Sequence, residues 1–253
     1  MLDVFQFRDF SMRQAPVGQR INTDSCVFGA VVGDDQSRPE RILDIGAGTG
    51  VVTLMVAHRF PNARVIAVEP EPSVADVAQA NFDTDLWKNR VGLLRRRIQD
   101  LDPAQCGRFD LVLCNPPYFQ NSRLSADRAT ALARHNCDMS PEEIYASMLR
   151  FMLPDATAWL SFPECDSRLW LKSGEELGLH PFRQIILSEH QAAKPHVVIA
   201  GWTTKPTGGA SPHVTRLLYR TAPQGELSPW MKSFRKQWFP AQFNKNSYAV
   251  DPD

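Results

Sequence analysis

Four consecutive residues, Asn115, Pro116, Pro117 and Tyr118, combine groups that can hold a flat ligand carrying an amino group. The apolar run before them, residues 109–114, has the length and composition of a buried strand. The prolines end that strand, because each fixes φ and lacks an N–H donor. The Asn115 amide oxygen and the Pro116 carbonyl can then each accept one N–H of an NH2 group, while the Tyr118 ring stacks on its plane. Taken alone, the motif is equally typical of a tight turn.

A glycine-rich segment upstream favours a ligand site over a simple turn. A strand pattern over residues 41–45 runs into Asp-x-Gly-x-Gly-x-Gly, a helix pattern follows over 51–59, and a second strand pattern over 63–69 ends in an acid. Together they have the size of one βαβ unit. Glycines let the backbone approach a ligand closely, and an acid about twenty residues later is placed for ribose hydroxyls. The residues concerned are Asp44, Gly46, Gly48, Gly50 and Glu69.

These features share one predicted edge of a sheet. Glu69 ends the second strand of the pattern, and Asn115 falls where the fourth strand should end. Ligands of doubly wound sheets bind outside the carboxyl ends of the strands. Asp100 follows the third predicted strand, residues 91–99, and can either accept a hydrogen bond from an adenine amino group or serve as a turn residue.

Thr23 and Asp24 precede an apolar helical pattern over residues 27–32. Either residue can cap that short helix, and the alternative is a lid over the small-molecule site that follows. Both interpretations remain open at this stage.

Two basic segments are candidates for phosphate contacts. Residues 119–136 form a long loop or broken helix beside the predicted site, and long loops are often functional; a solvated helix face is the alternative. A predicted helix over 228–239 carries further lysine and arginine side chains. The candidate residues are Arg123, Arg128, Arg134, Lys232, Arg235 and Lys236. The arginines at 95–97 lie on a predicted strand and should point alternately to opposite faces.

Composition limits the classes of protein. The chain has 253 residues, of which 43% are hydrophobic and 22% charged, with a formal net charge of zero. These are ordinary values for a globular protein, and any basic surface must be local. Five cysteines are scattered without a C-x-x-C pair, which predicts neither a metal site nor a disulfide framework and favours a reducing cytoplasm. We expect no signal peptide and no membrane span.

The remaining patterns complete an α/β fold. Two late strands, residues 180–187 and 196–202, are joined by a linker with no helix pattern, so we expect them to pair antiparallel. The sequence predicts a doubly wound, mostly parallel, seven-stranded sheet whose last strand pair is antiparallel. We expect a lead-in segment over 1–35, a core over 36–205 and a strand–helix extension over 206–253. The other expected elements are helices over 72–84, 141–153 and 166–177 and strands over 156–162 and 213–220.

The glycine loop, the acids and Asn-Pro-Pro-Tyr together resemble the class I S-adenosylmethionine-dependent methyltransferases, and the last motif resembles their amino-methylating branch. The lead-in at 5–32, with Arg20 where a lysine is typical, looks like that of the bacterial tRNA1(Val) adenine-37 N6-methyltransferases. The resemblance implies S-adenosylmethionine as cofactor and an adenine of the tRNA anticodon loop as target. Rival hypotheses are protein glutamine N5-methylation, amino-methylation of ribosomal RNA and a non-catalytic S-adenosylmethionine-binding regulator. Oligomeric state stays open.

The resemblance also implies roles for individual residues. The glycine loop with Asp44 would shape the pocket for the amino acid portion of the cofactor, Glu69 would bind its ribose and Asp100 its adenine. Thr23 and Asp24 would help to close the site. Asn115, Pro116 and Tyr118 would hold the target base.

Overall fold

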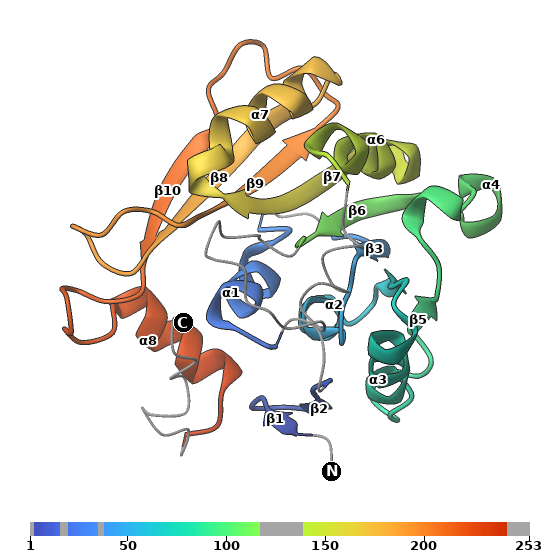
Figure 1. Cartoon of the computed structure of the whole chain (residues 1–253), viewed down its shortest axis with the longest axis horizontal. Helices are drawn as coiled ribbons and strands as arrows, with labels where there is room; N and C mark the ends of the chain where they lie inside the picture. The colour runs from blue at the N-terminus through green and yellow to red at the C-terminus, as the bar shows by residue number, and fades with distance from the viewer. Residues whose placement is uncertain (1–2, 16–19, 35–37, 117–138, 242–253) are drawn as a thin grey trace, which may run out of the picture.

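The computed structural model describes residues 3–15, 20–34, 38–116 and 139–241, which form a central eight-stranded sheet between two layers of helices (Figure 1). Every pairing in this sheet is parallel except those of β9, which lies antiparallel between β7 and β8. In sheet order the strands are β10 (His213–Leu218), β8 (His180–Ser188), β9 (Val197–Thr203), β7 (Met152–Pro163), β6 (Phe109–Cys114), β3 (Arg41–Ile45), β4 (Arg64–Val68) and β5 (Val91–Leu94).

The predicted fold class is confirmed, with one strand more than expected. The two late strands pair antiparallel as β8 and β9. The sheet has eight strands instead of seven because β10, predicted as part of a C-terminal extension, joins it at the edge. His213 pairs with Arg183 and Leu218 with Ser188 in parallel register. The extension therefore continues the core sheet.

Helices cover the two faces of the sheet in separate layers (Figure 1). One apolar cluster joins one sheet face to α1 (Thr23–Val31), α2 (Val51–Arg59), α3 (Pro72–Phe82) and α8 (Pro229–Trp238). A second cluster joins the other face to α6 (Pro141–Phe151) and α7 (Ser167–Glu176). The short elements are α4 (Pro103–Cys106) and the 3-10 turns η1 (Ile98–Asp100) and η2 (Glu164–Asp166).

Strand periodicity explains why both faces are covered. In β6, Leu111 and Leu113 belong to the first cluster, while Val112 and Cys114 belong to the second. Because successive side chains of a strand point to opposite faces, a run that is apolar throughout requires a helical layer on each side.

Helix starts follow side-chain caps, with one correction to the prediction. Asn22 caps α1 by accepting the Ser25 N–H at 2.8 Å, so neither Thr23 nor Asp24 is the cap. Asparagine caps as well as aspartate does, and capping by Asn22 leaves the Asp24 side chain available for contacts elsewhere. At α6, Ser140 and Glu143 form the predicted capping box.

The third strand is shorter than predicted. β5 ends at Leu94, and the arginines at 95–97 are all exposed before η1 begins. If the strand continued through these arginines, their side chains would point alternately to the two covered faces of the sheet, and burying them would cost the desolvation of a charge. The chain therefore leaves the sheet there, and Arg95 pairs with Asp76 on α3 at 2.5 Å.

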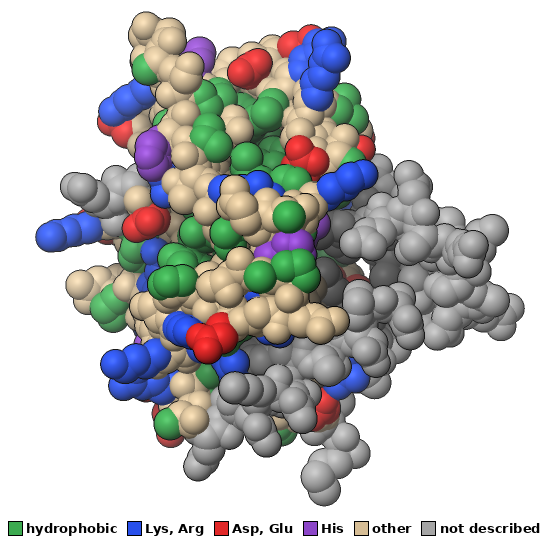
Figure 2. Space-filling view, turned by 90° about the vertical axis from the view of Figure 1, so that its left-hand side faces the viewer, with side chains coloured by type: hydrophobic (Ala, Val, Ile, Leu, Met, Phe, Trp, Pro, Cys, Tyr) green, Lys and Arg blue, Asp and Glu red, His purple; other side chains and the backbone are tan. Residues whose placement is uncertain are grey.

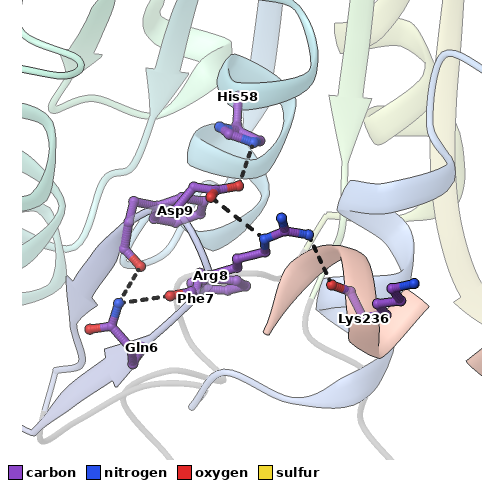
Figure 3. A network of polar contacts seen from close by, with 7 residues as sticks. Gln6, Phe7, Arg8, Asp9, His58 and Lys236 are labelled. Carbon is purple, nitrogen blue, oxygen red and sulfur yellow. Dashed lines mark hydrogen bonds and ion pairs between the residues drawn. The ribbon is translucent and has the colours of Figure 1, made fainter. Parts of the chain in front are cut away.

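A small hairpin of β1 (Val4–Gln6) and β2 (Ser11–Arg13) lies against the end of α8 (Figure 3). The Arg8 N–H donates to the Trp238 carbonyl at 2.7 Å, and the Arg8 guanidinium donates to the Lys236 carbonyl at 3.2 Å. Phe7 stacks on Phe239 with ring centroids 5.6 Å apart. Segments from opposite parts of the sequence thus meet in one junction.

The described residues contain neither a candidate membrane span nor a cluster of potential metal ligands. None of their helices is long and apolar enough to cross a membrane. No group of three or more potential metal ligands lies together among them.

Candidate functional site

The candidate site lies at the carboxyl ends of β4, β3 and β6 and beside the neighbouring part of β7. Ile45 pairs with Val68 and with Cys114, and Cys114 pairs with Leu160. The residues that directly follow these four are Gly46, Glu69, Asn115 and Ser161. The register therefore brings the predicted loop, acid and amide to one edge, and it adds a serine that sequence reasoning missed.

The glycine loop adopts a backbone that few other residues tolerate. Gly46 and Gly48 have φ of 71° and 58°, in the left-handed region. A Cβ built on either residue would meet no atom of the described residues within 4 Å, so both border space that this part of the chain leaves open. Gly50 (φ 95°) differs, because a Cβ there would lie 2.4 Å from the Phe82 ring. The first two glycines leave room for a ligand, and the third permits close packing.

Glu69 braces this loop from the neighbouring strand. Its two carboxylate oxygens accept the Gly48 N–H and the Glu71 N–H, each at 2.9 Å. The side chain is 8% exposed, and burial raises its pKa although both hydrogen bonds oppose the shift. A carboxylate oxygen accepts more than one hydrogen bond, so these contacts are compatible with binding ribose hydroxyls.

Asp44 is a buried acid beneath the loop. Its carboxylate accepts a hydrogen bond from Thr53 Oγ1 on α2 at 2.6 Å, and 1% of the residue is exposed. Burial raises the pKa of Asp44 to about 6. The hydrogen bond from Thr53 opposes this rise, and the charge of Glu69 adds to it. A cationic group bound nearby would favour the ionised form. The amino group of S-adenosylmethionine is such a cation.

Asn115 is held between two serines. Ser161 Oγ donates to Asn115 Oδ1 at 2.5 Å, and Asn115 Nδ2 donates to Ser25 Oγ at 3.2 Å. Asn115 and Pro116 are half-buried at the end of β6, which agrees with the predicted end of the strand at this motif.

Asp24 links α1 to the far part of the sheet. Its Oδ1 accepts a hydrogen bond from the Tyr219 hydroxyl at 2.5 Å and lies 3.2 Å from His196 Nε2. The His196 and Tyr219 rings are in edge contact, with centroids 5.6 Å apart. Burial, followed by the charge of Asp24, raises the pKa of the Cys26 thiol. Asp24 therefore fastens the helix that carries Ser25.

The other predicted residues lie around this edge. Asp100 is exposed at the end of η1, and Thr23 is half-buried at the start of α1. Arg20 is exposed and pairs with Asp3 at 2.6 Å. Pro117, Tyr118, Arg123, Arg128 and Arg134 lie outside the described residues.

The predicted basic residues of α8 lie together with a cation from the hairpin. Arg8, Lys232, Arg235 and Lys236 line a groove between these elements, and Lys232 pairs with Glu226 at 2.6 Å. Figure 2 shows Lys and Arg side chains gathered on this side of the molecule, at the height of α8 in Figure 1.

Sequence reasoning missed the side chains that arrive from distant segments. These residues are Ser25, Thr53, Ser161, His196 and Tyr219. Only Ser161 has a visible signal, as a polar residue that directly follows the apolar run at residues 158–160 near the end of a predicted strand.

The site fits S-adenosylmethionine on its own features. Two left-handed glycines border space that no described residue fills, and two buried acids adjoin them, a set of groups that can accept hydrogen bonds from a cationic amino acid portion and from ribose hydroxyls.

The family model of the methyltransferase small domain matches residues 26–138. The tRNA1(Val) (adenine(37)-N6)-methyltransferase of Pedobacter heparinus is 36% identical over 64% of this chain and 68% of its own. The protein of the same name from Aliivibrio salmonicida is 32% identical over 70% of this chain and 74% of its own. With that of Porphyromonas gingivalis the identity is 34%, over 64% of this chain, and the match spans 65% of the relative's length.

Solved structures of lower identity share the fold. A predicted O-methyltransferase from Agrobacterium tumefaciens aligns with a TM-score of 0.62 and 16% identity over 84% of this chain and 95% of its own. TYW2 of P. horikoshii, in complex with MeSAdo, aligns with a TM-score of 0.56 and 16% identity over 81% of this chain and 72% of its own.

Sheet order, glycine loop and these matches define a Rossmann-like methyltransferase, for which S-adenosylmethionine is the cofactor. Within that class, the chain belongs to the family of bacterial tRNA1(Val) (adenine(37)-N6)-methyltransferases.

Proposed function

We propose that this protein methylates N6 of adenine 37 in the anticodon loop of tRNA1(Val). The observation that carries the proposal is the position of Asn115, whose carboxamide lies beside the glycine loop at the end of β6, with its oxygen and nitrogen held by separate partners. The nucleotide and the tRNA are taken from the names of the relatives, which are tRNA1(Val) (adenine(37)-N6)-methyltransferases. A tRNA substrate implies a cytoplasmic enzyme.

Asn115 and Pro116 would overcome the weak nucleophilicity of an exocyclic amine. The lone pair of that amine is delocalised into the purine ring. Accepting its two N–H groups at Asn115 Oδ1 and the Pro116 carbonyl favours a geometry in which the lone pair points at the methyl donor. Groups that stabilise such a geometry act on the transition state more than on the bound substrate. Tyr118 would stack on the base, and Pro117 would keep the motif rigid.

The glycine loop and its acids would orient the cofactor. Bound S-adenosylmethionine supplies an electrophilic methyl group and its leaving group. Gly46, Gly48 and Gly50 would let the backbone approach its amino acid portion, with Asp44 beneath. Glu69 would accept ribose hydroxyls and Asp100 the adenine amino group, while Thr23 and Asp24 close the site from α1.

Basic side chains would position the RNA through its phosphates. Lysine and arginine contacts to phosphates set register without reading sequence. We assign this role to the four cations of the groove beside α8, to the arginines of the segment that follows the motif, and to the arginine of the lead-in segment. These residues are Arg8, Arg20, Arg123, Arg128, Arg134, Lys232, Arg235 and Lys236.

The deciding experiment measures methyl transfer from labelled S-adenosylmethionine to unmodified tRNA1(Val) transcripts. Nucleoside digestion and mass analysis should show N6-methyladenosine, and a transcript with guanine at position 37 should show none. The Asn115→Ala variant is the matched negative protein. Transfer to a glutamine-containing protein or to ribosomal RNA, with none to tRNA, would replace the proposed substrate.

A further inference from the structure

We propose that Ser161 and Ser25 are positioning residues that hold the Asn115 carboxamide in the orientation that accepts the target amino group. This inference rests on the role proposed above for Asn115. Ser161 donates to the carboxamide oxygen at 2.5 Å, and the carboxamide nitrogen donates to Ser25 at 3.2 Å. The serines are 1% and 4% exposed. Two buried hydroxyls thus contact opposite ends of one amide.

Both hydroxyls sit on firmly held backbone. Ser161 lies inside β7, where it pairs with Ile199 of β9 and follows Leu160, the partner of Cys114 in β6. Ser25 lies in the first turn of α1, and its N–H donates to the cap side chain of Asn22. Because strand and helix are both packed in the core, the two hydroxyls are fixed reference points for the amide between them.

An asparagine in an active site needs such reference points. The torsion that rotates its carboxamide has a broad, nearly two-fold preference, and a half-turn exchanges oxygen for nitrogen. Presented to an amino substrate, the wrong end would set a donor against a donor. A donor at Oδ1 and an acceptor at Nδ2 favour one orientation. A carboxamide oxygen has two acceptor positions, so accepting the Ser161 proton is compatible with accepting a substrate N–H.

Neither serine touches the substrate in this account, so their loss should change turnover rather than cofactor binding. We expect Ser161→Ala to lower kcat about 10- to 100-fold, the order of effect produced by small misplacements of reacting groups. The dissociation constant for S-adenosylmethionine, measured by calorimetry, should stay within about twofold because Ser161 is not among the residues proposed to contact the cofactor. Ser161→Thr, which keeps the hydroxyl, should recover most of the lost kcat.

The matched control is Ser173→Ala. Ser173 is 2% exposed on α7, and its hydroxyl hydrogen-bonds to the Glu142 carboxylate of α6 and, at 3.0 Å, to the Leu169 carbonyl. The Ser173→Ala substitution removes a buried serine hydroxyl that lies away from the sheet edge carrying Asn115. Its kcat should therefore stay near that of wild type. Undiminished kcat in folded Ser161→Ala overturns the inference, as does an equal loss in the control or an equal loss of cofactor affinity.

A second variant keeps the test decisive if Ser161→Ala does not fold, as judged by thermal unfolding. Ser25→Ala removes the other contact and should lower kcat about 3- to 10-fold, a fraction of what a misplaced reacting group can cost. Wild-type kcat in that variant would count against the inference.

A readout without turnover separates this inference from the proposed function. In 15N-asparagine-labelled protein, the Asn115 side-chain NH2 signals can be assigned by their absence from Asn115→Ala. They should shift in the folded Ser161 and Ser25 variants but not in Ser173→Ala. Unchanged signals overturn the positioning role. If the signals shift while wild-type protein makes no N6-methyladenosine, the proposed function fails and the positioning role stands.

Discussion

The two halves of the site are built in different ways. Around β3 and β4, the site is shaped mainly by the backbone. Left-handed glycines border the open space, and the Gly48 N–H donates to Glu69 only 21 positions away. Around β6 and β7, side chains meet from distant segments, as in the contacts of Asn115 with Ser161 and Ser25, 46 and 90 positions apart. The first half depends on local conformation, and the second depends on the completed fold.

The largest effect is expected in the side-chain half. Asn115→Ala should lower kcat about 10²- to 10³-fold, as the loss of one positioned polar group in an active site does. Cofactor affinity should change little, because the glycine loop is untouched. Activity assays paired with calorimetry would measure both. A parallel loss of affinity would show that the two halves are not separable in function.

Within the backbone half, two glycines should respond differently. Gly50→Ala should lower the free energy of unfolding by about 2–4 kcal/mol, because a left-handed backbone and overpacking against Phe82 each cost about 1–3 kcal/mol. Gly46→Ala, with no atom of the described residues near its new methyl group, should cost about 1–2 kcal/mol from backbone strain alone but weaken cofactor binding. Denaturant unfolding and calorimetry would separate these outcomes, and equal responses would contradict the assignment of Gly46 to the ligand.

The buried acid links stability to cofactor binding. Because burial raises the pKa of Asp44 to about 6 from 3.8, its contribution to stability is present below pH 4 and lost as the pH rises through 6. Asp44→Asn should therefore raise the free energy of unfolding by about 1–3 kcal/mol at pH 8 and by little near pH 4.

The same substitution should weaken S-adenosylmethionine binding at pH 8, because the carboxylate partner of the cationic amino group is gone. In wild type the affinity should fall as the pH drops below about 6, and in Asp44→Asn this dependence should be weaker. If Asp44→Asn is instead less stable than wild type at pH 8, burial of the ionised Asp44 carboxylate does not destabilise the folded protein.

The smallest expected effect concerns the hydrogen bond from Tyr219 to Asp24, which holds α1 against the chain after β10. Tyr219→Phe removes the hydrogen bond to Asp24 and should cost about 1–2 kcal/mol of stability, the value typical of a bond to a charged group. Tyr145→Phe is the control, because the buried Tyr145 hydroxyl has no hydrogen-bond partner among the described residues. That change should be neutral or slightly stabilising. Similar losses of stability in both variants would assign the effect to packing and not to the hydrogen bond between Tyr219 and Asp24.

What the sequence predicted follows the same division. The glycine loop, the acid after β4 and the strand before Asn115 are local patterns, since spacing and composition within about thirty residues define a βαβ unit. The partners of Asn115 and Asp24 could not be read in that way. Their approach depends on the register of β7 against β6 and on the course of the chain after β10, which are set by packing across the whole sheet.

Local errors also had physical causes. The sequence predicts the cap of α1 one or two residues late, because threonine and aspartate are good caps and so is Asn22, which caps the helix in the structure. The predicted third strand is too long because it includes the arginines at 95–97, which leave the sheet and stay hydrated. The division into lead-in, core and extension stays a prediction.

The junction of Arg8 with Trp238 has a consequence for the order of events during synthesis. At about 5–20 residues per second, the ribosome needs roughly 10–50 s to make the chain between these partners. During that interval Phe7 lacks its stacking partner Phe239, although Phe10 can already pack on Trp87 and the glycine loop has been made. The nascent chain would acquire a cofactor-binding half early and a sealed hydrophobic surface late. Chaperone engagement should therefore end only when α8 emerges from the ribosomal exit tunnel.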